Sequence, residues 1–184
     1  METTVLSPQS RNKNWLLAYS ILNTSRGWVG VMASPFGIRK LALPRETPEQ
    51  ALFALGNLNG ATIDECHFAS LEKKLQAYFN GEKVTFDEIT DLAEYSPFMQ
   101  SVWRVTRQVG YGQTASYRDI ASKTVSPRSF RAVGTALKHN PVPIIVPCHR
   151  IIGADGRIGG FNGGVALKKE LLLLEQKGLS GVEC

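Results

Sequence analysis

Few cysteines and no long apolar run occur in this chain, and both shortages limit what the protein can be. Its 184 residues contain three cysteines, Cys66, Cys148 and Cys184, an odd and widely spaced set that does not predict a disulfide framework. The longest apolar stretches, such as residues 171–174, fall far short of the roughly 20 residues that cross a bilayer. The first residues lack the basic start and apolar core of a secretory signal. We therefore expect a cytoplasmic protein in a reducing compartment, with no membrane contact.

Acidic residues are scarce in one part of the chain. The net charge is +5, with a sequence pI near 9.2. Between residues 104 and 150 the only acid is Asp119. Eight cations fall in that stretch: Arg104, Arg107, Arg118, Lys123, Arg128, Arg131, Lys138 and Arg150. Such one-sided charge is typical of a surface that contacts phosphates. A solvated basic face is the alternative, and it explains the asymmetry less well.

Metal-ligand spacings are missing as well. The sequence has no Cys-x-x-Cys and no His-x-x-x-His pair. The neighbours Cys66 and His67 fall in a predicted helix, where such a pair more often packs than ligates. We predict no metal site.

The first half predicts a small α/β domain. Turn residues separate short apolar runs, which indicates hairpins formed by strands at residues 15–22, 28–33 and 38–43. Pro48 and Glu49 begin a predicted helix that ends near Gly60. A second helix is expected from about Cys66 to Phe79. Residues 83–95 are more acidic and less periodic, which is typical of a linker.

The second half predicts short helices, and these cover residues 96–109, 114–121, 128–139 and 164–177. Thr114 or Ser116 caps the second of them. The second and third helices, joined by a tight turn, are typical of a helix-turn-helix. Small residues on the third helix, Ala132 and Gly134, would let its backbone approach DNA or pack against another helix.

The segment from Asn140 to Arg150 carries the most informative motif. Its three prolines fix the backbone and remove hydrogen-bond donors, which predicts a stiff, non-helical approach to Cys148. The apolar residues within it predict burial, so that the thiol lies on the floor of a pocket. A pre-positioned sulfur suits nucleophilic catalysis. The alternative is that Cys148 is only a small buried hydrophobe.

The thiolate is the reactive form of cysteine, and His149 is the candidate base that would generate it. Neighbouring side chains in an extended chain point in opposite directions, so His149 is expected to act through a water or across a turn. An acid should orient the histidine, and Glu175 and Asp155 are both candidates. The glycine-rich loop at residues 159–164 forms a wall of the pocket or a plain connector.

Pro147-Cys148-His149-Arg150, preceded by Asn140-Pro141-Val142-Pro143, resembles the active-site signature of O6-alkylguanine-DNA alkyltransferases. The resemblance extends from about residue 96 to residue 177, and the first half fits the family loosely by size and element order. It implies an α+β fold. A small mixed α/β domain of ribonuclease H-like type covers residues 1–90, and a mainly helical winged helix-turn-helix DNA-binding domain covers residues 91–184.

The resemblance also implies a function, that of a suicide repair protein. Such a protein flips O6-alkylguanine out of duplex DNA and transfers the alkyl group irreversibly to its own cysteine, here Cys148, with O4-alkylthymine as a further substrate. His149 would take the thiol proton through a water, and Glu175 would orient His149. Asn140 would brace the turn before the cysteine, and Tyr117 would donate a proton to the departing guanine.

The family's contacts carry over to further residues of this sequence. Arg131 matches the arginine finger that fills the gap left by the flipped nucleotide. The other expected DNA contacts are Arg118, Arg128, Ala132, Gly134 and Thr135. The expected substrate pocket consists of Pro143, Ile151, Phe161, Asn162 and Gly163. The implied partner is double-stranded DNA, bound in the minor groove without sequence preference by a monomer that needs no cofactor and lies with the nucleoid, or in the nucleus of a eukaryote.

Departures and rival functions complete the prediction. The zinc ligands of some relatives are absent, Asn162 stands where a serine is common, and Phe130 precedes the finger arginine where a smaller residue is expected. A non-catalytic damage sensor would lack Cys148. A Cys-His hydrolase does not need the basic helix-turn-helix, and a plain transcription regulator does not need the buried cysteine motif.

Overall fold

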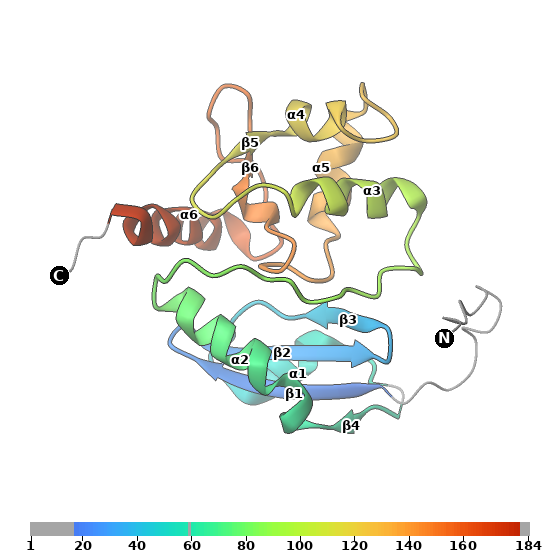
Figure 1. Cartoon of the computed structure of the whole chain (residues 1–184), viewed down its shortest axis with the longest axis vertical. Helices are drawn as coiled ribbons and strands as arrows, with labels where there is room; N and C mark the ends of the chain where they lie inside the picture. The colour runs from blue at the N-terminus through green and yellow to red at the C-terminus, as the bar shows by residue number, and fades with distance from the viewer. Residues whose placement is uncertain (1–16, 59, 181–184) are drawn as a thin grey trace, which may run out of the picture.

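The computed structural model describes residues 17–58 and 60–180; Trp15 and Cys184 lie outside them. Its main elements are β1 (Ala18–Thr24), β2 (Gly27–Ser34), β3 (Gly37–Leu41), α1 (Pro48–Leu55), β4 (Thr62–Ile63), α2 (Glu65–Phe79), α3 (Pro97–Thr106), β5 (Ala115–Ser116), α4 (Tyr117–Ser122), α5 (Phe130–Lys138), β6 (Ile151–Ile152) and α6 (Gly164–Ser180). A four-stranded sheet with two helices is followed by a mainly helical half, and the connecting segment runs between them (Figure 1). The predicted α+β fold is confirmed.

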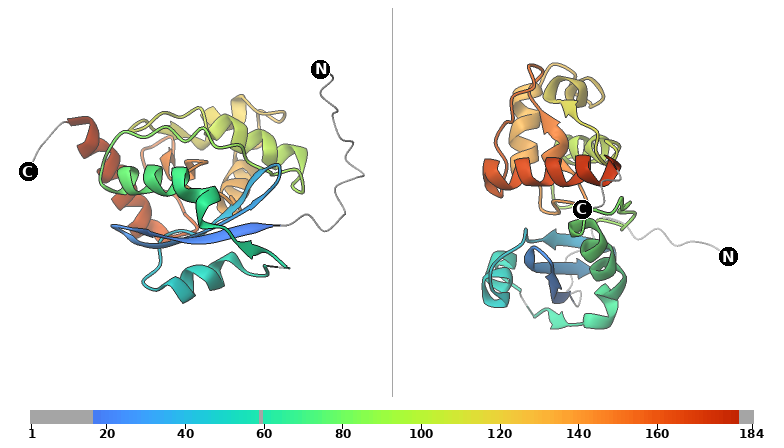
Figure 2. Two further views of the ribbon diagram at one scale, coloured as in Figure 1. Left: turned by 60° about the horizontal axis from the view of Figure 1, so that its bottom comes forward. Right: turned by 90° about the vertical axis from the view of Figure 1, so that its left-hand side faces the viewer.

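The sheet of the first half is covered by a helix on each face. Its strand order is β3-β2-β1-β4, with β4 parallel to β1 and the other pairs antiparallel. Along β2, Val29 and Val31 belong to the main core, whereas Met32 lies in the smaller cluster with Leu55 of α1. This alternation is the one expected of a strand. Figure 2 shows α1 and α2 on opposite faces of the sheet.

The predicted linker joins the two halves without helix or regular sheet. Residues 80–96 connect α2 to α3, and residues 89–91 pair with β3: Ile38 N donates to Ile89 O (2.8 Å) and Asp91 N donates to Ile38 O (2.9 Å). A Cβ at Gly37 would lie 2.5 Å from the same Ile89 oxygen, so this close approach requires glycine. The linker is therefore held against the sheet.

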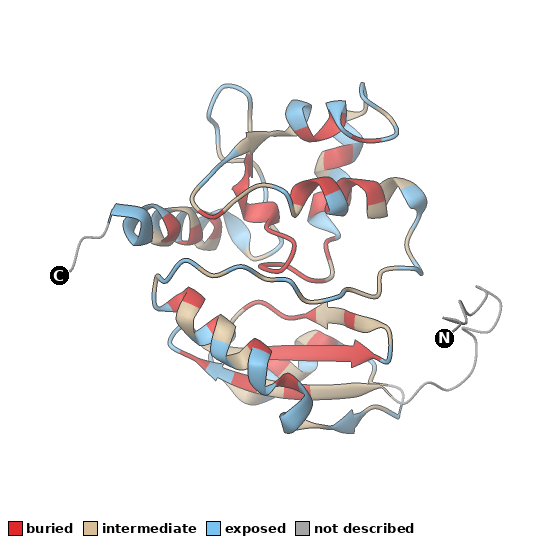
Figure 3. Cartoon of the chain, viewed as in Figure 1, coloured by how far each residue is buried: buried red, intermediate tan, exposed pale blue. Residues whose placement is uncertain are grey.

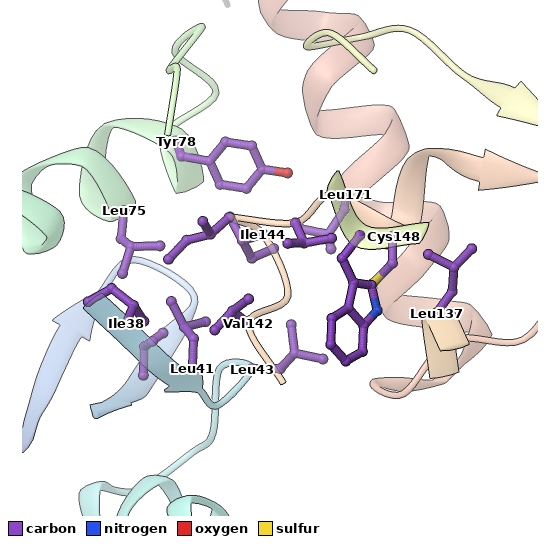
Figure 4. Packing of buried hydrophobic residues seen from close by; sticks show 14 of the residues in the cluster. Ile38, Leu41, Leu43, Leu75, Tyr78, Leu137, Val142, Ile144, Cys148 and Leu171 are labelled. Carbon is purple, nitrogen blue, oxygen red and sulfur yellow. The ribbon is translucent and has the colours of Figure 1, made fainter. Parts of the chain in front are cut away.

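The segment around the cysteine motif is buried between the two halves. Val142 and Ile144 belong to one apolar cluster with Leu41 and Leu75 of the first half and Leu137 of α5 (Figure 4). Figure 3 shows this segment as a continuous buried stretch between the sheet and the helices. The predicted burial is confirmed, and the core that surrounds the motif spans both halves.

Several predicted boundaries are wrong. The first helix ends at Leu55 and not near Gly60, because Gly56 adopts a φ of 75° that a helix cannot continue through. The helix predicted at residues 128–139 begins at Phe130, since residues 126–129 form a turn in which Ser129 N donates to Ser126 O. Arg128 therefore lies in the turn and not on the helix.

The approach to the cysteine is also less extended than predicted. Ile144 adopts a left-handed φ of 74° within a turn closed by a hydrogen bond from Val146 N to Val142 O (2.9 Å). Cys148–Arg150 then forms a single turn of 3-10 helix. The two-residue strands β4, β5 and β6 were not predicted. Among the described residues, no helix has the length and apolarity needed to cross a membrane.

Candidate active site and nucleic-acid interface

Asn140 holds the turn that carries the cysteine. Its side-chain amide donates to Val146 O (2.8 Å) and to Cys148 Sγ (3.1 Å), and its Oδ1 accepts from Val142 N (3.1 Å). Asn140 is buried, so these bonds occupy polar atoms that would otherwise lack partners. The position of the sulfur therefore depends on the Asn140 side chain as well as on the prolines, because this side chain bonds both ends of the turn and the sulfur itself.

Cys148 itself is nearly inaccessible, with 4% of its surface exposed. Burial raises the pKa of its thiol to about 11, although the Asn140 hydrogen bond and the charge of Lys168 act in the opposite direction. The thiol is therefore protonated at neutral pH. Any reaction that needs the thiolate needs a base close by.

His149 is the nearest candidate base, and Glu175 of α6 orients it. The imidazole Nε2 lies 2.8 Å from Glu175 Oε1, and both side chains are fully buried. Because a carboxylate only accepts, Nε2 carries the hydrogen. Burial lowers the pKa of His149, which leaves the ring neutral at neutral pH. Nδ1 thus keeps its lone pair, and it has no hydrogen-bond partner among the residues that the structure describes.

The Glu175 carboxylate accepts several hydrogen bonds. Arg150 donates through Nε (3.1 and 3.0 Å) and Nη2 (2.9 Å), and Gly112 N donates to Oε2 (2.9 Å). Burial alone would raise the pKa of Glu175, but the hydrogen bonds from His149 and Arg150 hold it at about 2. Asp155, the other candidate orienting acid, lies on an exposed loop and pairs with Arg157.

Tyr117 begins α4 and lies close to the glycine loop. A Cβ at Gly159 would be 2.4 Å from the tyrosine hydroxyl, so only glycine permits this approach. Burial, and then the Cys148 thiolate, raise the pKa of the half-buried phenol, which stays protonated at neutral pH. Lys168 Nζ lies 5.8 Å from the centroid of the Tyr117 ring.

Lys168 and Tyr78 belong to this cluster although the sequence analysis assigned them no role. Lys168 is fully buried on α6, and its Nζ donates to Ile151 O (2.5 Å). Tyr78 of α2 donates to Glu175 Oε1 (2.7 Å). Lys168 and Glu175 share the buried side of α6 with Leu171, so charged residues at apolar positions of that helix were a usable signal. Tyr78 offered no such signal.

The second helix of the helix-turn-helix presents its basic side to solvent. Val133, Ala136 and Leu137 are buried on the inner side of α5. The predicted DNA contacts on α4, on the following turn and on α5 are exposed: Arg118, Arg128, Arg131, Ala132 and Thr135. Gly134 is partly covered by the Tyr117 ring, 3.8 Å from where a Cβ would stand. Phe130, the unexpectedly large residue before Arg131, is 47% exposed.

Three of the five predicted pocket residues lie beside a cavity or beside His149. Pro143 and Asn162 line a cavity of about 360 Å³, together with Lys40, Arg45 and Lys138. Phe161 lies against His149, with ring centroids 6.4 Å apart.

Two further pocket residues are more enclosed than predicted. Ile151 is completely buried, so its side chain belongs to the core and only its carbonyl faces the Lys168 ammonium. Gly163 is packed so closely that a Cβ would lie 2.7 Å from Leu43 and from Leu167.

Comparisons with known proteins identify the family of this chain. The model of the 6-O-methylguanine DNA methyltransferase DNA-binding domain matches residues 97–177. A methylated-DNA--protein-cysteine methyltransferase of Methanosarcina acetivorans is 37% identical over 153 residues, which are 80% of this chain and 97% of that protein. One from Mycolicibacterium paratuberculosis is 46% identical over 118 residues, 64% of this chain and 71% of that protein.

Among solved structures, Mycobacterium tuberculosis OGT in complex with DNA superimposes with a TM-score of 0.75 at 34% identity, covering 88% of this chain and 94% of that one. A structure of O6-methylguanine-DNA methyltransferase from the archaeon Pyrococcus kodakaraensis gives a TM-score of 0.63 at 26% identity. Sequence and fold agree over both halves, and the chain therefore belongs to the family of methylated-DNA–protein-cysteine methyltransferases.

Proposed function

We propose that this protein repairs O6-alkylguanine in duplex DNA by moving the alkyl group irreversibly onto Cys148, once per molecule. The observation that carries the proposal is the buried thiol bonded to Asn140 and followed by the His149–Glu175 pair. These groups supply a nucleophile, a base and an orienting acid, all of them buried in the core. The family membership supports the same chemistry.

The proton balance follows from the tautomer of His149. The free Nδ1 lone pair accepts the thiol proton through one water while Nε2–H stays bonded to Glu175. The sulfur attacks the alkyl carbon, a C–S bond forms, and the bond between that carbon and guanine O6 breaks. Tyr117 donates a hydrogen bond or proton to the departing guanine, which lowers the charge on the leaving group.

DNA must deliver the base to a sulfur that is only 4% exposed. An alkyl group stacked inside a duplex cannot reach it, so the nucleotide is rotated out of the helix. The exposed side of α5 enters the minor groove, and Arg131 fills the gap in the stack. Further contacts come from Arg118, Arg128, Ala132, Gly134 and Thr135. Since these contacts favour phosphate charge over base edges, binding is independent of sequence.

The flipped base is held by Pro143, Phe161 and the glycine loop, with Asn162 and Gly163 beside the alkyl group and the backbone of Ile151 below it. O4-alkylthymine, which presents a similar alkyl oxygen, is a second substrate. The protein acts as a monomer on the nucleoid, or in the nucleus of a eukaryote. Residues 1–90 and 91–184 are its two domains.

The deciding experiment measures the intact mass of the protein after incubation with duplex DNA that contains O6-methylguanine. A single added methylene mass, stoichiometric and mapped to the Cys148 peptide, is expected. Retained lesion binding with no change in mass would replace the proposal with a damage sensor. Repeated turnover of a peptide ester would replace it with a thiol hydrolase.

A further inference from the structure

Tyr78 connects the first half of the chain to the candidate proton relay, which consists of Cys148, His149 and Glu175. It is the penultimate residue of α2, and its side chain is completely buried. Its hydroxyl donates to Glu175 Oε1 (2.7 Å) and lies 3.2 Å from His149 Nε2. We infer that Tyr78 is a positioning residue that holds Glu175 and His149 in register for alkyl transfer. This inference rests on the proposed function and gives the first half a part in the chemistry.

The end of α2 is held tightly against α6, which keeps the hydroxyl in place. A Cβ at Gly178 would lie only 2.1 Å from Gly81 O, so glycine permits the contact between the two helix ends. Figure 4 shows Tyr78 at the end of α2 with its hydroxyl pointing toward the ribbon of α6. The phenol therefore has little freedom to turn away.

Aromatic neighbours fix the ring as well. The Tyr78 ring makes edge contacts with Phe79 (5.3 Å), Phe86 (5.6 Å) and Tyr111 (6.1 Å between centroids). Its ring also lies 6.4 Å from the imidazole of His149. A side chain packed on several sides in a dense core has little room to move. The hydroxyl is thus a fixed neutral donor to a buried carboxylate.

A neutral donor suits this place in the relay. Burial, and then Glu175, raise the pKa of Tyr78 well above its usual value, so the hydroxyl keeps its proton. Arg150 already supplies positive charge to both oxygens of Glu175. Removing the hydroxyl would therefore change the charge of the carboxylate little, while it would loosen the contact between Oε1 and His149 Nε2. The imidazolium that forms as the thiol ionises would lose part of its support.

The test replaces Tyr78 by phenylalanine, which keeps the ring and removes only the hydroxyl. The matched control is Tyr111→Phe, because Tyr111 lies in the same aromatic cluster but its hydroxyl bonds to a backbone carbonyl. Two rates are followed against pH: transfer of the benzyl group from free O6-benzylguanine, and alkylation of Cys148 by iodoacetamide, mapped by peptide mass. Melting temperatures are measured for all three proteins.

Tyr78→Phe is expected to slow both reactions about tenfold at neutral pH and to move their midpoints to higher pH, whereas Tyr111→Phe leaves both midpoints in place. A lowered melting temperature with unmoved midpoints in Tyr78→Phe would show a purely structural tyrosine and overturn the inference. If the wild type gains no methylene mass from duplex DNA that contains O6-methylguanine, the proposed function fails. The iodoacetamide profile would still decide whether Tyr78 acts on the thiol.

Discussion

The side-chain amide of Asn140 donates a hydrogen bond to Cys148 Sγ at 3.1 Å. The same amide group holds Val146 O, and its oxygen holds Val142 N. One side chain therefore fixes the backbone turn and the sulfur together. It also offsets part of the burial that raises the pKa of the thiol to about 11. Because the turn keeps two of its bonds without the sulfur, Cys148 can be replaced without dismantling its surroundings.

Cys148→Ala is expected to abolish alkyl transfer and to preserve binding to duplex DNA. Alanine removes the sulfur but leaves the bonds from Asn140 to the turn. Loss of a few buried atoms costs about 1–2 kcal/mol of stability, which a folded domain tolerates. Mass spectrometry and a binding titration on methylated duplex measure the two properties. Residual uptake of alkyl mass in this variant would remove Cys148 as the acceptor.

Glu175→Gln is expected to raise the apparent pKa of Cys148 alkylation and to slow the reaction at pH 7 roughly a hundredfold. The neutral amide no longer stabilises the imidazolium of His149, and its NH₂ group faces the Arg150 guanidinium. The pH dependence of benzyl transfer from O6-benzylguanine measures this shift. A profile identical to that of the wild type would exclude Glu175 from the relay.

Arg131→Ala is expected to slow repair in duplex DNA roughly ten- to a hundredfold while leaving attack on free O6-benzylguanine unchanged. Arg131 is exposed, and under the proposed function its guanidinium is required only when a nucleotide has to be extruded from the stack. Arg26→Ala is the control, since Arg26 is an exposed cation of the first half that pairs with Glu170. Equal losses on both substrates would contradict the role of Arg131 as the finger.

The protein is expected to lose stability in acid through Glu175. Its pKa is about 2 in the folded state, below its ordinary value of 4.5, so its contribution is complete above pH 4.5 and disappears as the pH falls toward 2. The shift corresponds to roughly 3 kcal/mol. Urea unfolding of the wild type and Glu175→Gln between pH 2 and 7 measures it. Parallel curves across that range would be inconsistent with this contribution.

The residues that the structure brings together around Cys148 were easier to predict from sequence than the boundaries of the elements. Cys148 and His149 are neighbours in the chain, so a local motif was enough to select them, and the family resemblance added Glu175. Boundaries depend on single conformations instead. Gly56 adopts a left-handed φ that ends α1 early, and the turn at residues 126–129 delays the start of α5. Neither is visible in apolar periodicity.

Partners from distant parts of the chain were harder to find. Tyr78 reaches Glu175 across 97 residues of sequence, and only the packing of α2 on α6 brings them together. Lys168 is one of two adjacent lysines, Lys168 and Lys169, and the helix phase alone decides which is buried. The two-residue strand β4 is too short to leave a period-two pattern.

The burial of Cys148 also bears on how well the thiol resists oxidation before it reacts. Under the proposed function the Cys148 sulfur reacts only once, so it must not be consumed by peroxide or by other electrophiles before the protein binds a lesion. Oxidants attack exposed thiolates, and this thiol is both covered and protonated. Cys66 on the outer surface of α2 has no such cover and meets oxidants first. The low exposure of Cys148 therefore protects the thiol from side reactions until the protein binds a lesion.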